Sequence, residues 1–569
     1  METVVQVSPR ERWLMLALLA VFFSFGLFDH SLWSSNDTRE GSMIATMARG
    51  GSWTLPQLNG EPYLEKPPLL HWTGAALCRL TGVINEGMVR LPAALYGFGS
   101  VLLIWLFGRA LGRERAGLIA AALCASSLLM IEYAKIVLTD TALTFVVMLS
   151  LWLFWRAYTA KTWRVLRYFL FLLASALAFY AKGLLGPGFV WVTVCLFLLW
   201  RREWKLLFGL PLAFLPLFAL VLAPWVGALF AAGGRDYLVG VFWDNQFGRF
   251  LSFNDTSLPL DPYFVHKEPL WYYLKSAPLR LLPWTLLVVA ALVSWFRRGS
   301  AQRGDLALFL RLALVTMAAV LHVSAAKTAC YLLPLFPILF LMTGVWIEDA
   351  LRPGGARRWE RAALGLTTGA LAVGALLAPV GVLIAHLILT RINHGVVCRL
   401  PLAVLICDGV LLLMAFVLAL VCFRRLLRWW RAGEAPTIAW FGPQMCIVLV
   451  VLNFAAVLPV LESARSYRPF TDLVRAQVGV AGRIGFTSDE ERDLGALNFY
   501  FGRSVDFVAS DESLTEYLFV GTRPVGVIVP EDHIAEVRDK LLAGCPVQYL
   551  QATNGGRKAR DYWLIVPRP

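Results

Sequence analysis

The chain has 569 residues, of which 58% are hydrophobic and only 16% charged, and its mean hydropathy is +0.64. An average soluble domain is about 45–50% apolar, so the composition excludes a soluble globular protein and predicts a polytopic membrane protein. The formal net charge of +14 does not indicate a nucleic-acid binder, because the lysines and arginines gather in short breaks between apolar runs. Nine cysteines without a CxxC pair indicate neither a disulfide framework nor a zinc ribbon.

The apolar runs begin at residues 13–28, directly after Arg10 and Arg12. This run has no small-residue cleavage site, so we interpret it as a retained signal anchor with a cytoplasmic N-terminus. Later basic breaks are separated by pairs of apolar stretches of about 20 residues, the length that crosses a bilayer. The pattern predicts an α-helical domain at residues 1–461 with about thirteen transmembrane helices, the last near 438–460, and a C-terminus opposite the N-terminus.

The outer segments hold most polar residues that have no evident role in orientation. They include a first loop at residues 29–90 and a long loop at 233–275. Because these residues gather on one side of the predicted membrane domain, we expect the chemistry on that face.

The composition changes after residue 461. Short β-like runs, RIGFTS, SVDFVA, VGVIVP and YWLIV, alternate with segments of helical spacing, LGALNFYFG, SLTEYLFV and HIAEVRDKLL. The alternation predicts a small α/β domain at residues 462–569, exported by the last span. It contains no glycine fingerprint and no nucleophile motif, so we expect a capping or substrate-gating role.

Two carboxylates near the outer face are candidate catalytic groups. Asp37 follows the first span, and residues 38–49 have helical spacing, so Asp37 could equally cap that helix together with Asn36. Capping and catalysis are compatible. Asp140 ends a near-apolar span, where a carboxylate needs a cavity or a partner, and Lys135 is the alternative, purely structural partner.

Basic side chains recur in the outer turns. Lys182 lies at the outer end of a span, where it could snorkel or meet an anionic headgroup. Lys327 lies just outside another span, and Tyr331, four residues on, is predicted on the same helical face.

The long loop adds further candidates. Arg249, His266 and Lys267 lie near aromatic residues 271–273, which are also typical of an interfacial belt. His266 with Glu65 could bind a divalent metal, but no third ligand is evident.

Carboxylates facing several lysines and arginines at a lipid–water boundary indicate a site for a phosphate-bearing lipid. The bases would neutralise the phosphate, and the acids would orient or deprotonate an acceptor. A glycosyl phosphate already has a good leaving group, so the protein need mainly stabilise the departing charge. No nucleotide motif is present, so the donor energy would reside in the lipid. A transporter, with broken helices and an internal repeat, and a scaffolding protein are the competing classes.

The first loop also resembles a known family. NDTREGSMIATMARGGSWTLPQLNGEPYLEKPPLLHW is similar to the first outer loop of bacterial members of the protein O-mannosyltransferase superfamily, above all the aminoarabinose transferases that modify lipid A. The likeness continues through RLPAAL, LTDTAL, AKGLLG, NQFGRF, HKEPLWYY, KTACYLLPLFP and LGALNFYFGRSV.

The resemblance implies a C-type glycosyltransferase fold with a periplasmic α/β tail and an undecaprenyl-phosphate-linked sugar donor. It implies catalytic roles for Asp37 and Asp140. Donor-phosphate or substrate contacts are expected from a set of basic and aromatic residues: Arg39, Lys66, Lys182, Arg249, Lys267, Lys327 and Tyr331. Glu65 and His266 fall at possible metal positions, although no cofactor is required.

The implied reaction is inverting transfer of a sugar at the periplasmic face of a bacterial inner membrane, most specifically of 4-amino-4-deoxy-L-arabinose to a lipid A phosphate. The alternatives are another sugar transferred to a protein or glycan, and, more remotely, transport of a lipid or glycan. Two departures bear on the choice: Asn36-Asp37 replaces the family's acid pair, and Arg39-Glu40-Gly41-Ser42 replaces its RYAE.

Overall fold

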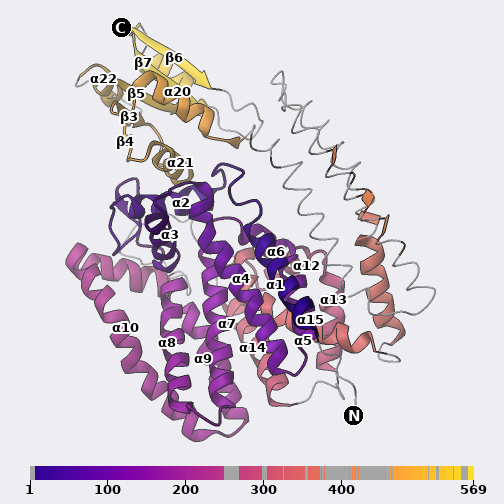
Figure 1. Cartoon of the computed structure of the whole chain (residues 1–569). Helices are drawn as coiled ribbons and strands as arrows, with labels where there is room; N and C mark the ends of the chain where they lie inside the picture. The colour runs from indigo at the N-terminus through magenta and orange to yellow at the C-terminus, as the bar shows by residue number, and fades with distance from the viewer. Residues whose placement is uncertain are drawn as a thin grey trace.

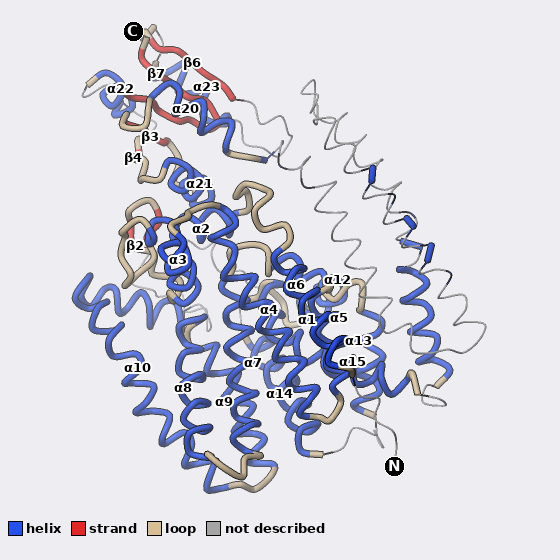
Figure 2. Tube along the Cα trace, in the orientation of Figure 1, coloured by secondary structure: helices blue, strands red, loops and turns tan. Residues whose placement is uncertain are grey.

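The structure is a computed structural model that describes residues 7–248, 268–297, 304–324, 326–352, 357–371, 466–509, 512–520, 524–542, 544–552 and 562–568, with isolated residues between 373 and 465. A bundle of helices forms the larger part of the molecule, and a small α/β unit lies against one end of it (Figure 1). Among the described residues, the strands lie in that unit apart from one short hairpin, as Figure 2 shows.

The first half of the bundle contains helices of very different length. They are α1 (Pro9–Ser24), α2 (Ser35–Ala48), α3 (Leu69–Thr81), α4 (Glu86–Ala110), α5 (Glu114–Ala125), α6 (Leu128–Tyr133), α7 (Thr139–Tyr158), α8 (Arg164–Lys182), α9 (Leu185–Trp200) and α10 (Trp204–Leu238). Between α2 and α3, β1 (Gln57–Leu58) and β2 (Glu61–Pro62) form a short antiparallel hairpin.

The second half begins with the π-helical segment η1 and includes a sharply broken pair of helices. Its elements are η1 (Val239–Gly248), α12 (Tyr272–Arg280), α13 (Thr285–Phe296), α14 (Asp305–Val323), the 3-10 helix η3 (Ala329–Leu335) and α15 (Phe336–Ala350). The pair α12 and α13 is bent by 119°.

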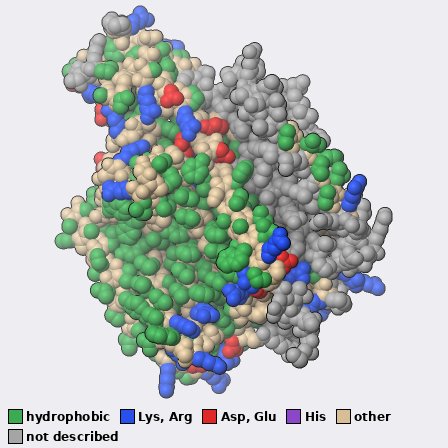
Figure 3. All heavy atoms as spheres, viewed as in Figure 1, with side chains coloured by type: hydrophobic (Ala, Val, Ile, Leu, Met, Phe, Trp, Pro, Cys, Tyr) green, Lys and Arg blue, Asp and Glu red, His purple; other side chains and the backbone are tan. Residues whose placement is uncertain are grey.

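Among the described residues, six helices are long and apolar enough to cross a membrane, or seven if the bent pair counts as one span. The prediction of a polytopic helical membrane protein is therefore confirmed, while the count of thirteen spans stays a prediction. Of the predicted last span, at 438–460, the structure describes only Leu458. A broad hydrophobic surface covers the helical part in Figure 3, with charged side chains above it and along its lower rim.

Aromatic side chains pack against one another where the last turns of α7 and α9 meet the first turns of α14. Phe154 stacks on Phe309 at 5.4 Å between ring centroids, and Phe197 meets both rings edge-on, at 6.1 and 5.2 Å. The three residues come from α7, α14 and α9, and each is fully buried. Such pairs add about 0.5–1.5 kcal/mol each beyond the burial of their area, so they hold these three helices together.

The C-terminal unit has the predicted α/β character. Its helices are α20 (Arg468–Val478), α21 (Glu491–Phe501), α22 (Glu512–Phe519) and α23 (Glu531–Glu536), which continues into η6 (Val537–Leu541). Its strands are β3 (Arg483–Phe486), β4 (Asp506–Phe507), β5 (Val525–Pro530), β6 (Val547–Ala552) and β7 (Tyr562–Pro567).

The five strands form one mixed sheet in the order β4-β3-β5-β7-β6. The pairs β3–β4 and β3–β5 are parallel, and β5–β7 and β6–β7 are antiparallel. Along β5, Ile528 packs into one hydrophobic cluster while Val527 and Val529 pack into another. The alternation places an apolar layer on each face of the sheet. The boundary between residues 461 and 462 stays a prediction.

One local prediction for the first loop needs correction. The helix expected at 38–49 begins earlier, at Ser35, because the hydroxyl of Ser34 accepts a hydrogen bond from the backbone N–H of Asp37 at 3.2 Å. Ser34 is thus the N-cap, and Asp37 lies inside the first turn. The segment 29–90 contains α2, α3 and the start of α4, and its place as the first outer loop stays a prediction.

Candidate active site

A cavity of about 310 Å³ lies where several helix ends of the bundle meet the first loop. Its charged and polar lining includes Glu65, Lys66, Lys182, Asn245, Gln246 and Tyr331. Its apolar lining includes Leu184, Leu185, Val192, Val320 and Leu321. A cavity that combines charged groups with aliphatic side chains at the end of membrane-crossing helices suits an amphiphile with an anionic head.

Asp140 and Lys182 form an ion pair beside this cavity. The ammonium nitrogen of Lys182 lies 2.5 Å from Oδ1 of Asp140, whose side chain is only 2% exposed. Asp140 is in the first turn of α7, and Lys182 is in the last turn of α8. Each charge therefore lies at the helix end that stabilises it.

Lys182 is held from a second side by an aromatic ring. Its ammonium lies 4.0 Å from the centre of the Tyr331 ring, a distance at which the ring attracts a cation. Lys182 and Tyr331 both line the cavity, whereas the carboxylate of Asp140 lies behind Lys182. Asp140 consequently orients a cation that a ligand in the cavity can reach.

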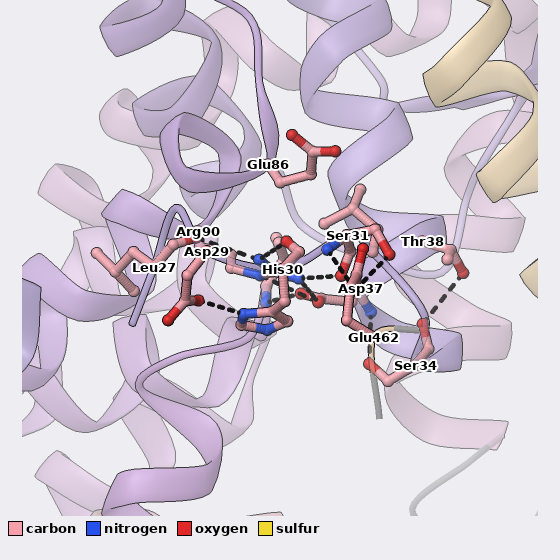
Figure 4. A network of polar contacts seen from close by, with 12 residues as sticks. Leu27, Asp29, His30, Ser31, Ser34, Asp37, Thr38, Glu86, Arg90 and Glu462 are labelled. Carbon is pink, nitrogen blue, oxygen red and sulfur yellow. Dashed lines mark hydrogen bonds and ion pairs between the residues drawn. The ribbon is translucent and has the colours of Figure 1, made fainter. Parts of the chain in front are cut away.

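Asp37 lies in a separate, closed network, which Figure 4 shows. Its Oδ2 accepts two hydrogen bonds from the guanidinium of Arg90, at 2.5 and 3.1 Å, and its Oδ1 accepts the backbone N–H of Val137 at 2.9 Å. Arg90 also donates to the carbonyls of Leu27, His30 and Ser31. Asp37 and Arg90 are both completely buried.

The contacts of Asp37 hold the first loop against the start of α7. Asp37 is not among the cavity-lining residues, and protein donors occupy both of its carboxylate oxygens. Val137 is three residues from Asp140, so their Cα atoms are at most about 11 Å apart. The two predicted acids are neighbours, but only the pair that contains Asp140 borders the cavity. The catalytic role of Asp37 stays a prediction.

Arg39 lies in a second polar network of the first loop. It donates to Glu491 of α21 at 2.7 Å and to Glu40 at 3.1 Å. Glu40 also meets Nε2 of the fully buried His71 at 2.8 Å. Burial opposes ionisation of Glu40, but the bond to His71 and the charge of Arg39 hold its pKa at about 2. Arg39 does not line the cavity.

Glu65 connects this network to the cavity through Tyr63, and Glu65 and Lys66 both line the cavity. The hydroxyl of Tyr63 lies 3.0 Å from Oε2 of Glu65 and can donate to it. Among the described residues, no three His, Cys, Asp or Glu side chains are grouped so that they could hold a metal. The predicted partner of Glu65, His266, lies outside the described residues, as do Arg249 and Lys267.

Lys327 differs from its predicted placement. The helical turn begins only at Ala329, so Lys327 does not share a helical face with Tyr331. Its ammonium donates to the backbone carbonyls of Ser324 at 2.5 Å and Glu268 at 3.1 Å. Lys327 is 3% exposed and is not among the cavity-lining residues, whereas Ser324, whose carbonyl it bonds, lines the cavity. Its contact with a donor phosphate stays a prediction.

Lys135, the alternative partner of Asp140, instead donates to the carbonyls of Phe22 and Phe25 near the end of α1. Burial lowers its pKa to about 8, although the nearby charge of Asp29 opposes that shift. The Asp140 partner seen in the structure is therefore Lys182.

Sequence reasoning missed several residues that the structure brings to these networks. Asn245 and Gln246 line the cavity, and Gln246 accepts the N–H of Leu184 at 2.9 Å. Both lie in NQFGRF, in which the sequence pattern predicts only Arg249 as a site residue. Arg90 was also missed, although an arginine at the start of an apolar helix needs a partner.

The fold and the cavity together define a polytopic membrane protein with a C-type glycosyltransferase fold. The structure superposes on that of ArnT from Cupriavidus metallidurans bound to undecaprenyl phosphate with a TM-score of 0.74, over 99% of this chain and 100% of that one, at 18% identity. The apo structure of the same protein gives a TM-score of 0.72.

Residues 65–229 match the family described as dolichyl-phosphate-mannose-protein mannosyltransferase. The undecaprenyl phosphate-alpha-4-amino-4-deoxy-L-arabinose arabinosyl transferase of Pseudomonas aeruginosa strain UCBPP-PA14 is 32% identical over 355 residues, or 62% of each chain. That of Edwardsiella ictaluri is 32% identical over 340 residues, covering 58% of this chain and 59% of its own length. The matches thus span less than two thirds of these relatives. The chain is thus similar to aminoarabinose transferases and, over residues 65–229, to protein mannosyltransferases, which agrees with the resemblance of its first loop.

Proposed function

We propose that the protein transfers a sugar from an undecaprenyl-phosphate-linked donor to an acceptor at the periplasmic face of the bacterial inner membrane. The single observation that carries the proposal is the cavity that Lys66, Lys182 and Tyr331 line together with aliphatic side chains. Two ammonium groups beside an apolar wall match a phosphate joined to a polyprenyl chain.

In the proposed reaction, an acceptor oxygen forms a bond to the anomeric carbon of the sugar. The bond between that carbon and the phosphate oxygen breaks, and the polyprenyl phosphate leaves with the electron pair. Lys66 and Lys182 stabilise the charge on the departing phosphate. Attack opposite the leaving group inverts the anomeric centre. Asp140 is a positioning residue that keeps Lys182 directed at the phosphate.

The most specific form of the proposal is transfer of 4-amino-4-deoxy-L-arabinose to a lipid A phosphate. The names of the relatives supply the sugar. A phosphate acceptor is already ionised and needs no general base. This agrees with the cavity lining, in which Glu65 is the one carboxylate among the described residues. If the acceptor is instead a hydroxyl, Glu65 is better placed than Asp37 to take its proton.

Transfer of another sugar to a protein or glycan is the second candidate. The match of residues 65–229 to a protein mannosyltransferase family favours it, as does the replacement of RYAE by Arg39-Glu40-Gly41-Ser42. Transport is the more remote candidate. Transporters contain broken helices, and the bent pair α12 and α13 is the feature of this structure that favours a transporter.

The proposal includes the membrane arrangement. Thirteen spans would leave the N-terminus in the cytoplasm and residues 462–569 in the periplasm. The packing of the α/β unit on the first loop supports this arrangement, because α2 and α21 must then lie on the same side of the membrane. Glu65 and His266 stay the predicted ligands of a divalent metal. No step of the proposed reaction depends on that metal.

Mass spectrometry of lipid A tests the proposal. Cells with and without the gene are compared under conditions that induce phosphate modification. Loss of an aminopentose mass on deletion, restored by the wild-type gene but not by Lys182→Met, is expected. Unchanged lipid A would reject the aminoarabinose assignment. Transfer of a different sugar to exported protein or glycan would then support the second candidate.

A further inference from the structure

The C-terminal unit contacts the first loop through closely packed backbones. A Cβ atom placed on Gly495 of α21 would lie 2.7 Å from the carbonyl of Thr38 and 2.8 Å from the Cα of Arg39. Real Cβ atoms do not approach backbone atoms this closely, so glycine is required at this crossing. The contact is made by Arg39 and by Thr38, the residue after Asp37. It fixes α21 against the first turns of α2.

Glu491 lies one helical turn before Gly495, on the same face of α21. Its Oε2 accepts a hydrogen bond from Nη1 of Arg39 at 2.7 Å and lies 3.5 Å from the hydroxyl of Tyr63. Arg39 also covers the Tyr63 ring, with its guanidinium carbon 5.6 Å from the ring centre. One carboxylate of the C-terminal unit therefore meets two side chains of the first loop.

Hydrogen bonds connect Tyr63 to the cavity and Arg39 to the start of α3. Tyr63 hydrogen-bonds Glu65 at 3.0 Å, and Glu65 lines the cavity beside Lys66. Arg39 bonds Glu40, and Glu40 bonds His71 at the start of α3. The hydroxyl of Tyr63 has one proton to share between Glu65 and Glu491, so its orientation depends on both carboxylates.

We propose that Glu491 is a positioning residue through which the C-terminal α/β unit sets the orientation of Glu65 and Lys66 in the cavity. The inference rests on the proposed function. Glu491 pairs with Arg39 of α2. Through the hydroxyl of Tyr63, the position of Glu491 also determines how Glu65 is hydrogen-bonded. The C-terminal unit is then a working part of the active site, although Glu491 does not line the cavity.

Glu491→Gln tests this role, with Asp489→Asn as the matched control. Asp489 is an exposed acid two residues earlier in the same unit, so its replacement removes the same charge from an exposed position. Misplacing a reacting group by about 1 Å costs up to about 100-fold in rate. For Glu491→Gln we expect kcat to fall about tenfold, with the KM for the lipid donor changed by less than about twofold.

A double-mutant cycle with Tyr63→Phe separates positioning from simple docking of the two parts. If Glu491 acts through Tyr63, the double variant loses no more rate than the worse of the two single variants. If Glu491 only holds the parts together, the two losses multiply. Thermal unfolding of the full chain in detergent shows whether each variant is folded, and Glu491→Asp, which keeps the charge, should recover part of the rate.

The inference is overturned if Glu491→Gln and Asp489→Asn have the same kcat, or if the losses in the cycle multiply. A wild-type protein that transfers no sugar from a polyprenyl phosphate donor would instead reject the proposed function. The two failures are therefore distinguishable in one set of assays.

Discussion

Two acid–base pairs lie near the same end of the bundle, and they differ in what surrounds them. Asp37 and Arg90 are both inaccessible, and their polar atoms are bonded to protein. Asp140 is equally buried, but its partner Lys182 is 16% exposed and lines the cavity. Asp37 and Asp140 give the same signal in the sequence, because each is an acid near the start of a helix at the membrane surface. The partner's access to the cavity separates a structural pair from one that can meet a ligand.

The largest expected effect is on the closed pair. Replacing one partner of a buried ion pair typically costs 3–5 kcal/mol, because the other charge loses its compensation. Asp37→Asn should lower the free energy of unfolding by about this amount, measured by chemical unfolding in mixed micelles. Asp29→Asn is the control, since its side chain is 44% exposed.

A second variant sharpens this test. Replacing both partners, Asp37→Leu with Arg90→Met, should recover part of the lost stability, because no buried charge is left alone. If Asp37→Asn abolishes turnover while the free energy of unfolding is unchanged, Asp37 is catalytic and the comparison between the two pairs fails.

The buried pair of Glu40 and His71 gives the next largest effect and is expected to appear in the pH dependence of stability. The pKa of Glu40 is lowered to about 2 from 4.5, so its contribution is present above pH 4.5 and is lost as the pH falls toward 2. The size of the shift corresponds to about 3 kcal/mol. Wild type should therefore lose stability over this window more steeply than Glu40→Gln in thermal unfolding. Parallel curves would show that Glu40 is not held in its ionised form.

The open pair should affect turnover more than stability. Lys182→Met removes a cation that the proposal places at the leaving phosphate, so kcat/KM should fall about 100-fold, or about 2.7 kcal/mol in the barrier. Lys327→Met is the informative control, because Lys327 bonds two backbone carbonyls and is not among the cavity-lining residues. Transfer assays with purified full chain should find this control within about threefold of wild type when it is folded. Equal losses in both variants would contradict the distinction.

The smallest effect concerns the ring below Lys182. A cation–π contact is worth about 0.5–2 kcal/mol, so Tyr331→Leu should lower donor affinity about twofold to thirtyfold. Tyr331→Phe keeps the ring and should bind the donor almost as wild type does. A larger loss for the phenylalanine variant would mean that the hydroxyl itself contacts the donor.

The sequence predicted the class of fold because apolar runs and basic breaks are local signals. It also predicted most of the C-terminal strands, and VGVIVP coincides with β5. Strand β6 was missed, because VQYLQA lies at the edge of the sheet and its two glutamines give a weaker apolar signal.

The sequence did not predict which charged side chains contact one another. Asp140 and Lys182 were both selected from the sequence, but only the crossing of α7 and α8 brings them together. Arg90 meets Asp37 across 53 positions. Glu491 meets Arg39 across 452, so no local pattern could connect the C-terminal unit to the first loop. Residues of the right chemistry were predictable, whereas their division into closed and open networks required the fold.

The most direct test of the account is equilibrium binding of undecaprenyl phosphate to the purified full chain, with undecaprenol as the matched ligand without a phosphate. Wild type should prefer the phosphate at least tenfold. Lys66→Gln combined with Lys182→Met should remove that preference, while folded Asp37→Asn keeps it. A double lysine variant that binds undecaprenyl phosphate as wild type does would contradict the assignment of the cavity as the donor site.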